Sequence, residues 1–170
     1  RGRHGRITEL TPGDVVVGSF SLSAMGELAV VSATPERYED VYVYTDSRAR
    51  RLTDLNPHTD DWKKPRVSVV TWTAPDGKTV EGVLELPYDH DPQADGPLPL
   101  VVNIHGGPTS ATPYCQRYWI YGRTLFPAKG WAMLSPNCRG STGYGDEFLI
   151  DLIGRENDIE VKDILAGVDA

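Results

Sequence analysis

The chain has 170 residues, of which 39% are hydrophobic and 24% charged, the mixture of an ordinary globular protein with room for one domain or parts of two. The net charge is -7 and the lysines and arginines are scattered, which excludes a basic surface for nucleic acid. No apolar run reaches the length needed to cross a membrane, so we expect no membrane partner.

The chain contains two cysteines, Cys115 and Cys138. Two are too few for a disulfide framework, and their spacing is not that of a metal site. We expect two free thiols, with a single disulfide as the alternative. The cysteine count leaves the compartment open and favours the cytoplasm.

The first third of the chain predicts short strands separated by turns. The runs rich in Val, Tyr and Thr are Val15–Val17, Leu28–Ser32, Asp40–Thr45 and Arg50–Thr53. Four short antiparallel strands in succession are the content of one β-propeller blade, and a generic β-meander is the alternative. The polar, proline-containing stretch that follows is typical of a linker between domains.

A hairpin is predicted next, from Val67–Thr73 and Val80–Leu86 around the turn residues Asp76 and Gly77. Alternation in the second strand places Glu85 on the face opposite to the apolar residues. Acids and one histidine cluster in the loop after this hairpin, at Asp89, His90, Asp91 and Asp95. We interpret this cluster as a solvated loop and expect no metal.

The pattern then changes to alternating strands and helices. Leu100–Ile104 is a continuous apolar run, as expected of a strand covered on both faces, and Trp131–Leu134 predicts the next buried strand. A helix is expected over residues 116–129, ended by Gly130. A second helix is indicated by Val161, Ile164, Leu165 and Val168, with Asn157 and Glu160 as a capping box. This order predicts an α/β domain entered from an antiparallel edge.

The motif that carries chemistry is His105-Gly106-Gly107-Pro108, directly after the first apolar strand. Hydrolysis of an amide or ester builds negative charge on the carbonyl oxygen, and backbone N–H groups must stabilise that charge. Glycines at a strand end let the backbone approach the substrate closely, and His-Gly-Gly is a familiar form of this loop in α/β-hydrolases. The alternative is a tight turn that simply needs glycine.

A second motif follows the next strand, where residues 137–148 read Asn-Cys-Arg-Gly-Ser-Thr-Gly-Tyr-Gly-Asp-Glu-Phe. With both motifs in this order, and with Asp76-Gly77 in the hairpin, the chain resembles the prolyl oligopeptidase family of serine peptidases. The resemblance is closest to the acylaminoacyl-peptidase-like branch. Cys138 departs from the family pattern, and we interpret it as a packing residue.

The resemblance implies a β-propeller followed by an α/β-hydrolase domain. Residues 1–56 would be the last propeller blade, 57–66 a linker, and 67–170 the N-terminal half of the hydrolase domain. Gly106 and Gly107 would form the oxyanion loop, with His105, Pro108, Arg139 and Tyr144 as supporting or substrate-binding residues. The substrate would be a short peptide, cleaved through an acyl-enzyme without metal or cofactor. Further partners would be the remainder of the same polypeptide and, as a possibility, identical subunits.

The family's catalytic serine lies in a G-x-S-x-G motif, followed by Asp and then His. No such motif occurs here, and Ser141 in Gly140-Ser141-Thr142-Gly143 is therefore interpreted as a loop serine. We expect the chain to be a fragment that is inactive alone. Two alternatives stay open: a carboxylesterase or lipase that shares the His-Gly-Gly loop, and a non-catalytic binding protein of the same fold.

Overall fold

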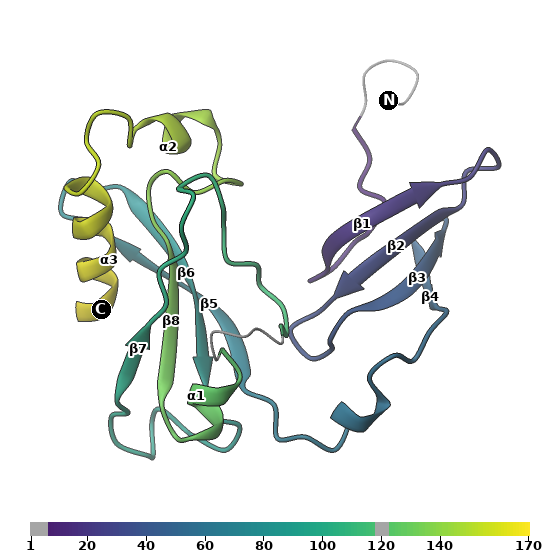
Figure 1. Cartoon of the computed structure of the whole chain (residues 1–170), viewed down its shortest axis with the longest axis horizontal. Coiled ribbons are helices and arrows are strands. Elements are labelled where there is room, and N and C mark those ends of the chain that lie inside the picture. Colours follow the sequence, from purple (N-terminus) through teal and green to yellow (C-terminus); the bar gives the residue numbers. More distant parts are fainter. Residues whose placement is uncertain (1–6, 118–122) are drawn as a thin grey trace. The chain divides into compact units, whose positions relative to one another are not determined.

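The computed structural model describes residues 7–117 and 123–170. Contacts between residues divide the chain into two compact units, Arg1–Trp62 with Cys115–Tyr118, and Lys63–Tyr114 with Trp119–Ala170. Each unit contains one four-stranded sheet (Figure 1). Within the described ranges, no helix is both long and apolar enough to span a bilayer.

The first unit is an antiparallel meander in which each strand pairs with the next one along the chain. Its core is a cluster of Leu28, Val30 and Tyr44. Its elements are β1 (Val16–Leu22), β2 (Leu28–Ala33), β3 (Asp40–Thr45), β4 (Arg48–Arg51) and the short 3-10 helix η1 (Pro57–Thr59). The sequence therefore predicted β3 with its observed bounds and β2 to within one residue, whereas β1 extends five residues beyond the predicted run.

Strand β4 begins and ends two residues before the strand that the sequence predicts. Asp46 and Ser47 have φ angles of 50° and 61°, and together they form a two-residue hairpin turn. The strand ends at Arg51 because Thr53 leaves the ladder. The Thr53 hydroxyl accepts a hydrogen bond from the Val41 N–H at 2.9 Å, so a side chain replaces a backbone partner.

The second unit has the strand order β5-β6-β8-β7, in which β6 is antiparallel to β5 and β8, and β7 is parallel to β8. The strands are β5 (Arg66–Thr73), β6 (Thr79–Leu86), β7 (Leu100–Val102) and β8 (Ala132–Asn137). The helices are α1 (Leu125–Ala128), α2 (Asp146–Ile150) and α3 (Ile159–Asp169). The expected hairpin is present, and Gly77 in its turn has a φ of 87°.

Trp72 fixes α3 against one face of this sheet. Its indole N–H donates a hydrogen bond to the Asp163 carbonyl at 2.7 Å. A Cβ added at Gly167 on α3 would lie 2.6 Å from the indole, and one at Gly82 on β6 would lie 2.9 Å from it. The two glycines therefore leave the space that the indole fills between helix and sheet.

Strand β7 and the opposite face of the sheet differ from expectation. The run Leu100–Ile104 does not form a strand covered on both faces: β7 has three residues at the sheet edge, and Ile104 is 59% exposed. Glu85 is not on a half-exposed face but is buried beside the Arg123 guanidinium. Burial raises the pKa of Glu85, and the charge of Arg123 opposes that rise. A buried ion pair of this kind cannot be seen from alternation alone.

Both predicted helices are altered at their ends. Part of the expected helix 116–129 lies outside the described residues, and the described part contains only the four-residue α1. Helix α3 is present, but its N-cap residue is Asp158, because Asn157 adopts a φ of 64°. Glu160 still accepts a hydrogen bond from the Asn157 N–H, so one half of the capping box forms.

Candidate active site

Two loops leave neighbouring parallel strands at the same end of the second unit's sheet. One follows β7 and carries the first motif, and the other follows β8 and leads into α2 (Figure 1). Carboxyl ends of parallel strands meet at one edge of a sheet, which is where ligand sites form in α/β proteins. The two motifs found in the sequence are thereby brought together.

The glycines of the first motif are exposed. Gly107 has a φ of 143°, which disfavours any other residue, and an added Cβ would lie 2.9 Å from the backbone nitrogen of Thr109. At Gly106 an added Cβ would meet nothing within 4 Å. Pro108 follows through a cis peptide bond, and its carbonyl accepts a hydrogen bond from the Ser110 N–H at 2.7 Å. The loop thus turns sharply at Gly107 and leaves open space beside Gly106.

His105 contacts the second loop. Its Nε2 atom lies 3.0 Å from the Ser141 Oγ atom. The Ser141 hydroxyl in turn lies 2.6 Å from the Cys138 carbonyl oxygen, to which it donates. A hydrogen bond therefore links His105 of the first motif to Ser141 of the second. Ser141 is 1% exposed, and His105 is half-buried.

Asn137, the last residue of β8, fastens the two loops a second time. Its amide oxygen accepts a hydrogen bond from the Thr112 N–H at 2.7 Å, and its amide nitrogen donates to the Thr112 carbonyl at 3.1 Å. The same nitrogen donates to the Tyr144 hydroxyl at 2.9 Å. Burial raises the pKa of Tyr144. Tyr144 is therefore tied to the base of both loops.

Arg139 anchors the second loop to three carboxylates. Its Nη2 atom lies 2.6 Å from the Asp163 Oδ1 atom, and its Nη1 atom contacts Asp76 and lies 3.2 Å from Asp151. The Arg139 backbone N–H also donates to Asp163 at 2.9 Å. The side chains of Arg139 and Asp163 are 2% and 0% exposed. These hydrogen bonds raise the pKa of Arg139, and the guanidinium lowers that of Asp76.

Cys138 and Cys115 are both buried and are not joined in a disulfide, so the single disulfide that the sequence left as an alternative is not formed. Burial, together with the nearby negative charge of Asp163, raises the pKa of Cys138 to about 11. The thiolate is the nucleophilic form of cysteine. Cys138 is therefore a neutral packing residue at physiological pH, as the sequence indicated.

Several residues that hold this site together were missed in the sequence. Asp163 lies between Val161 and Ile164 in α3, and a carboxylate at such a buried position was the available signal. Ser141 was interpreted only as a loop serine. Nothing in the sequence shows that its hydroxyl meets His105, because the two residues are separated by 36 positions.

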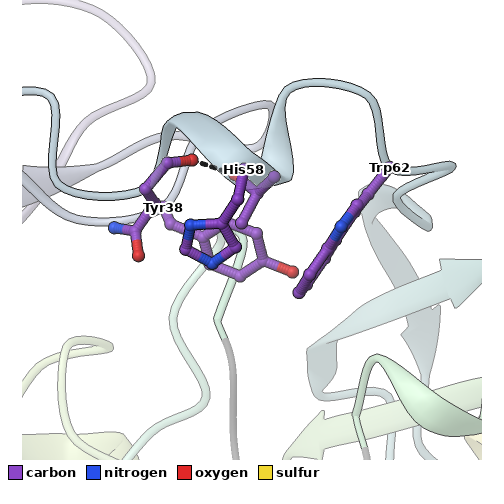
Figure 2. Close-up of a pocket in the computed structure, with 5 residues that line it drawn as sticks. Tyr38, His58 and Trp62 are labelled. Atoms are coloured by element: carbon purple, nitrogen blue, oxygen red, sulfur yellow. Dashed lines mark hydrogen bonds between the residues drawn. The ribbon is translucent and has the colours of Figure 1, made fainter.

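The first unit holds a separate pocket of about 300 Å³, lined by Tyr38, Asn56, His58, Thr59 and Trp62. Figure 2 shows the rings of Tyr38, His58 and Trp62 gathered around it. The ring centroids of His58 and Trp62 are 5.5 Å apart in an edge-to-face arrangement. None of these residues belongs to the motifs identified in the sequence.

The acidic loop before β7 is held by its own side chains. The Asp91 N–H donates to Asp95 at 2.8 Å, and the Gln93 N–H donates to Asp91 at 2.9 Å. Over residues 7–117 and 123–170, no three His, Cys, Asp or Glu side chains are grouped so that they could hold a metal ion.

This arrangement defines the kind of site: two parallel strands of one sheet end in neighbouring loops, one of which carries His105, Gly106 and Gly107. No protein-family profile matches the chain. Among curated proteins, dipeptidyl aminopeptidase BIII of Pseudoxanthomonas mexicana is 35% identical over 152 residues, which cover 84% of this chain and 21% of the relative.

Solved structures give the same picture. The acylaminoacyl peptidase of Pyrococcus horikoshii is 25% identical with a TM-score of 0.81, covering 98% of this chain and 26% of that one. A puromycin hydrolase is 30% identical with a TM-score of 0.74, covering 94% and 24%. This chain thus spans about a fifth to a quarter of the proteins that it matches.

In the region that it spans, the chain is similar to peptidases of the prolyl oligopeptidase family. The resemblance seen in the sequence is thereby confirmed, and the chain matches only a segment of each relative.

Proposed function

We propose that the protein containing this chain is a serine peptidase that hydrolyses short peptides through an acyl-enzyme, and that the loop Gly106–Gly107 stabilises the oxyanion. The observation that carries the proposal is the exposed, sharply turned glycine pair at the end of β7. The loop after β8 lies beside this glycine pair, is buried, and is held by the ion pair between Arg139 and Asp163. The relationship to peptidases supports the reaction class.

The domain assignment is part of this proposal. Residues 1–56 would form the last blade of a propeller, 57–66 a linker, and 67–170 the N-terminal half of an α/β-hydrolase domain. The four-stranded meander supports the first part, and the division between Trp62 and Lys63 falls within the proposed linker. Cys115 and Gln116 are an exception to the proposed boundaries, because their contacts group them with the first unit. There the Gln116 N–H donates a hydrogen bond to the Thr34 carbonyl at 2.8 Å.

In the proposed mechanism the chain's own residues bind charge and do not attack the substrate. As the serine adds to the carbonyl carbon, negative charge develops on the oxygen, and a backbone N–H of the glycine pair donates to it. Pro108 restrains the loop, since its φ is fixed. Arg139 and Tyr144 hold the neighbouring loop in place. No residue of this chain supplies the nucleophile in the proposal, so the 170 residues alone would be inactive.

The experiment compares Gly107→Ala with wild type in the full-length protein. A misdirected oxyanion donor lowers kcat by about 10²–10³-fold with little change in KM. Gly96→Ala is the matched control, because an added Cβ there meets nothing within 4 Å and Gly96 lies in the loop before β7. A folded Gly107→Ala protein with the wild-type kcat would remove the loop from the mechanism.

The substrates used in this comparison also decide between peptidase and esterase. Dipeptidyl and N-acetyl-aminoacyl p-nitroanilides contain amide bonds, whereas p-nitrophenyl butyrate is an ester. We expect hydrolysis of the anilides and labelling of the full-length protein by a fluorophosphonate, with no labelling of the 170-residue chain. Ester hydrolysis without amide hydrolysis would favour the carboxylesterase alternative. An unlabelled full-length protein would favour the binding protein.

A further inference from the structure

We propose that Ser141 is a positioning residue for the oxyanion loop: its hydroxyl fixes the His105 imidazole, and the imidazole holds the backbone that leads into Gly106 and Gly107. This inference rests on the proposed function. It assigns a task to a serine that is neither the nucleophile nor exposed to substrate.

The hydrogen bonds around Ser141 have only one consistent direction. A carbonyl oxygen can only accept, so the Ser141 O–H donates to the Cys138 carbonyl at 2.6 Å. The Ser141 oxygen is then left as an acceptor, and the His105 Nε2 atom at 3.0 Å must carry the proton. The contact therefore requires a proton on Nε2 and fixes the orientation of the ring, whose Nδ1 atom lies 3.4 Å from the Gly106 carbonyl oxygen.

The serine is a rigid anchor because its own loop is held from several sides. Arg139 is bound to Asp163, and the Gly140 N–H donates to the Phe148 carbonyl at 3.1 Å. The Ser141 N–H donates to the same Cys138 carbonyl as its hydroxyl, at 3.0 Å. A group fixed to this extent can impose its position on a more exposed partner.

The first loop is fastened on both sides of its glycines. On the C-terminal side, the Ser110 carbonyl accepts from the Thr142 N–H at 2.9 Å, and Thr112 pairs with Asn137. On the N-terminal side, His105 reaches Ser141. An added Cβ at Gly106 would touch nothing, so packing around that residue does little to define its peptide plane. We therefore assign that task to the flanking contacts.

Loss of the serine hydroxyl frees the imidazole and lets the adjacent peptide planes rotate. Because the oxyanion contact is made in the transition state, the effect falls on kcat, with KM nearly unchanged. Small misplacements by residues remote from the chemistry cost up to about 10²-fold in rate. We expect Ser141→Ala to lower kcat by about 10-fold to 10²-fold, less than Gly107→Ala.

The test uses the full-length protein with the p-nitroanilide substrates. His105→Gln keeps an N–H donor near the position of Nε2, whereas His105→Asn places its amide near Nδ1 and loses the contact with Ser141. We expect His105→Gln to retain at least about fivefold more kcat than His105→Asn. The double variant Ser141→Ala/His105→Asn should lose no more than its worse single variant, because both remove one interaction. Gly96→Ala, at which an added Cβ meets nothing within 4 Å, is again the control.

The outcomes separate the two proposals. A wild-type protein that neither hydrolyses the anilides nor reacts with a fluorophosphonate contradicts the proposed function, and the role of Ser141 falls with it. An active wild type with a folded Ser141→Ala variant at wild-type kcat contradicts the role of Ser141 alone. If Ser141→Ala does not fold, the comparison of His105→Gln with His105→Asn tests the inference instead. Equal kcat values for these two variants would overturn it.

Discussion

The loop after β7 and the loop after β8 contain glycines in similar number but are held in opposite ways. Around Gly106 and Gly107 the backbone is exposed and an added Cβ at the first position would meet nothing. In the second loop Cys138, Arg139 and Ser141 are all buried. In the proposed function the first loop faces the substrate and must leave space for it, so the fixed geometry that catalysis needs would come from the second loop.

Charge and shape both contribute to the rigidity of the second loop. Arg139 is enclosed by Asp76, Asp151 and Asp163, which together satisfy a guanidinium that is 2% exposed. Gly140 has a φ of 97° and passes close to Leu152 and Pro108. The difference between the loops therefore predicts where substitutions should reduce stability and where they should reduce turnover.

The largest effect on stability is expected from Asp163→Asn. The change leaves the buried Arg139 charge without its main partner, and breaking a buried pair in this way costs about 3–5 kcal/mol in the free energy of unfolding. The matched control is Lys162→Gln, which breaks an exposed pair with Asp158 at the neighbouring position of α3. Exposed pairs are worth less than about 1 kcal/mol. Urea denaturation of the full-length proteins compares the two, and equal losses would contradict the anchoring role of Arg139.

A smaller loss of stability is expected from Gly140→Ala. An added Cβ would overlap a Leu152 methyl group and lie 3.2 Å from Pro108, at a φ that is unfavourable for alanine. Because the Leu152 side chain can shift to relieve the overlap, we expect a total cost of about 1–3 kcal/mol from backbone strain and overpacking together. Gly106→Ala should change the free energy of unfolding by less than about 0.5 kcal/mol, as is usual at open surface sites. The comparison fails if the two variants melt at the same temperature.

The smallest effect concerns the reactivity of Cys138. Its pKa is raised to about 11, so the thiol stays protonated, and therefore unreactive, throughout the physiological range. We expect iodoacetamide to leave Cys138 unmodified at pH 7.5 and to react only where the pH approaches the raised pKa or the protein unfolds. Peptide mapping by mass spectrometry measures this directly. Rapid alkylation of Cys138 in folded protein at pH 7.5 would show that the second loop is not closed.

The parts of the fold that depend on local sequence were predictable. Strand β3 has the predicted bounds, and Asp76-Gly77 forms the predicted hairpin turn. Strand β7 was not predictable, because an apolar run does not reveal how many neighbours it pairs with, and it lies at the sheet edge. The buried partner of Glu85 is Arg123, 38 residues away, and no period in the sequence connects the two.

The candidate site divides in the same way. His105, Gly106, Gly107 and Pro108 were recognisable because the motif is continuous and its chemistry depends on the backbone. The residues that hold it come from separate elements. Asp163 belongs to α3 and meets Arg139 only after the helix packs on the sheet, so its role depends on tertiary structure.

The central claim is that the backbone of Gly106 or Gly107 donates to the oxyanion. The most direct test is a crystal structure of the full-length protein with a peptidyl trifluoromethyl ketone bound covalently to its catalytic serine, since the adduct carries the tetrahedral oxygen. The account predicts that the nitrogen atom of Gly106 or Gly107 lies about 2.7–3.1 Å from that oxygen. Both nitrogen atoms beyond hydrogen-bonding distance, with the oxygen held by other groups, would contradict it.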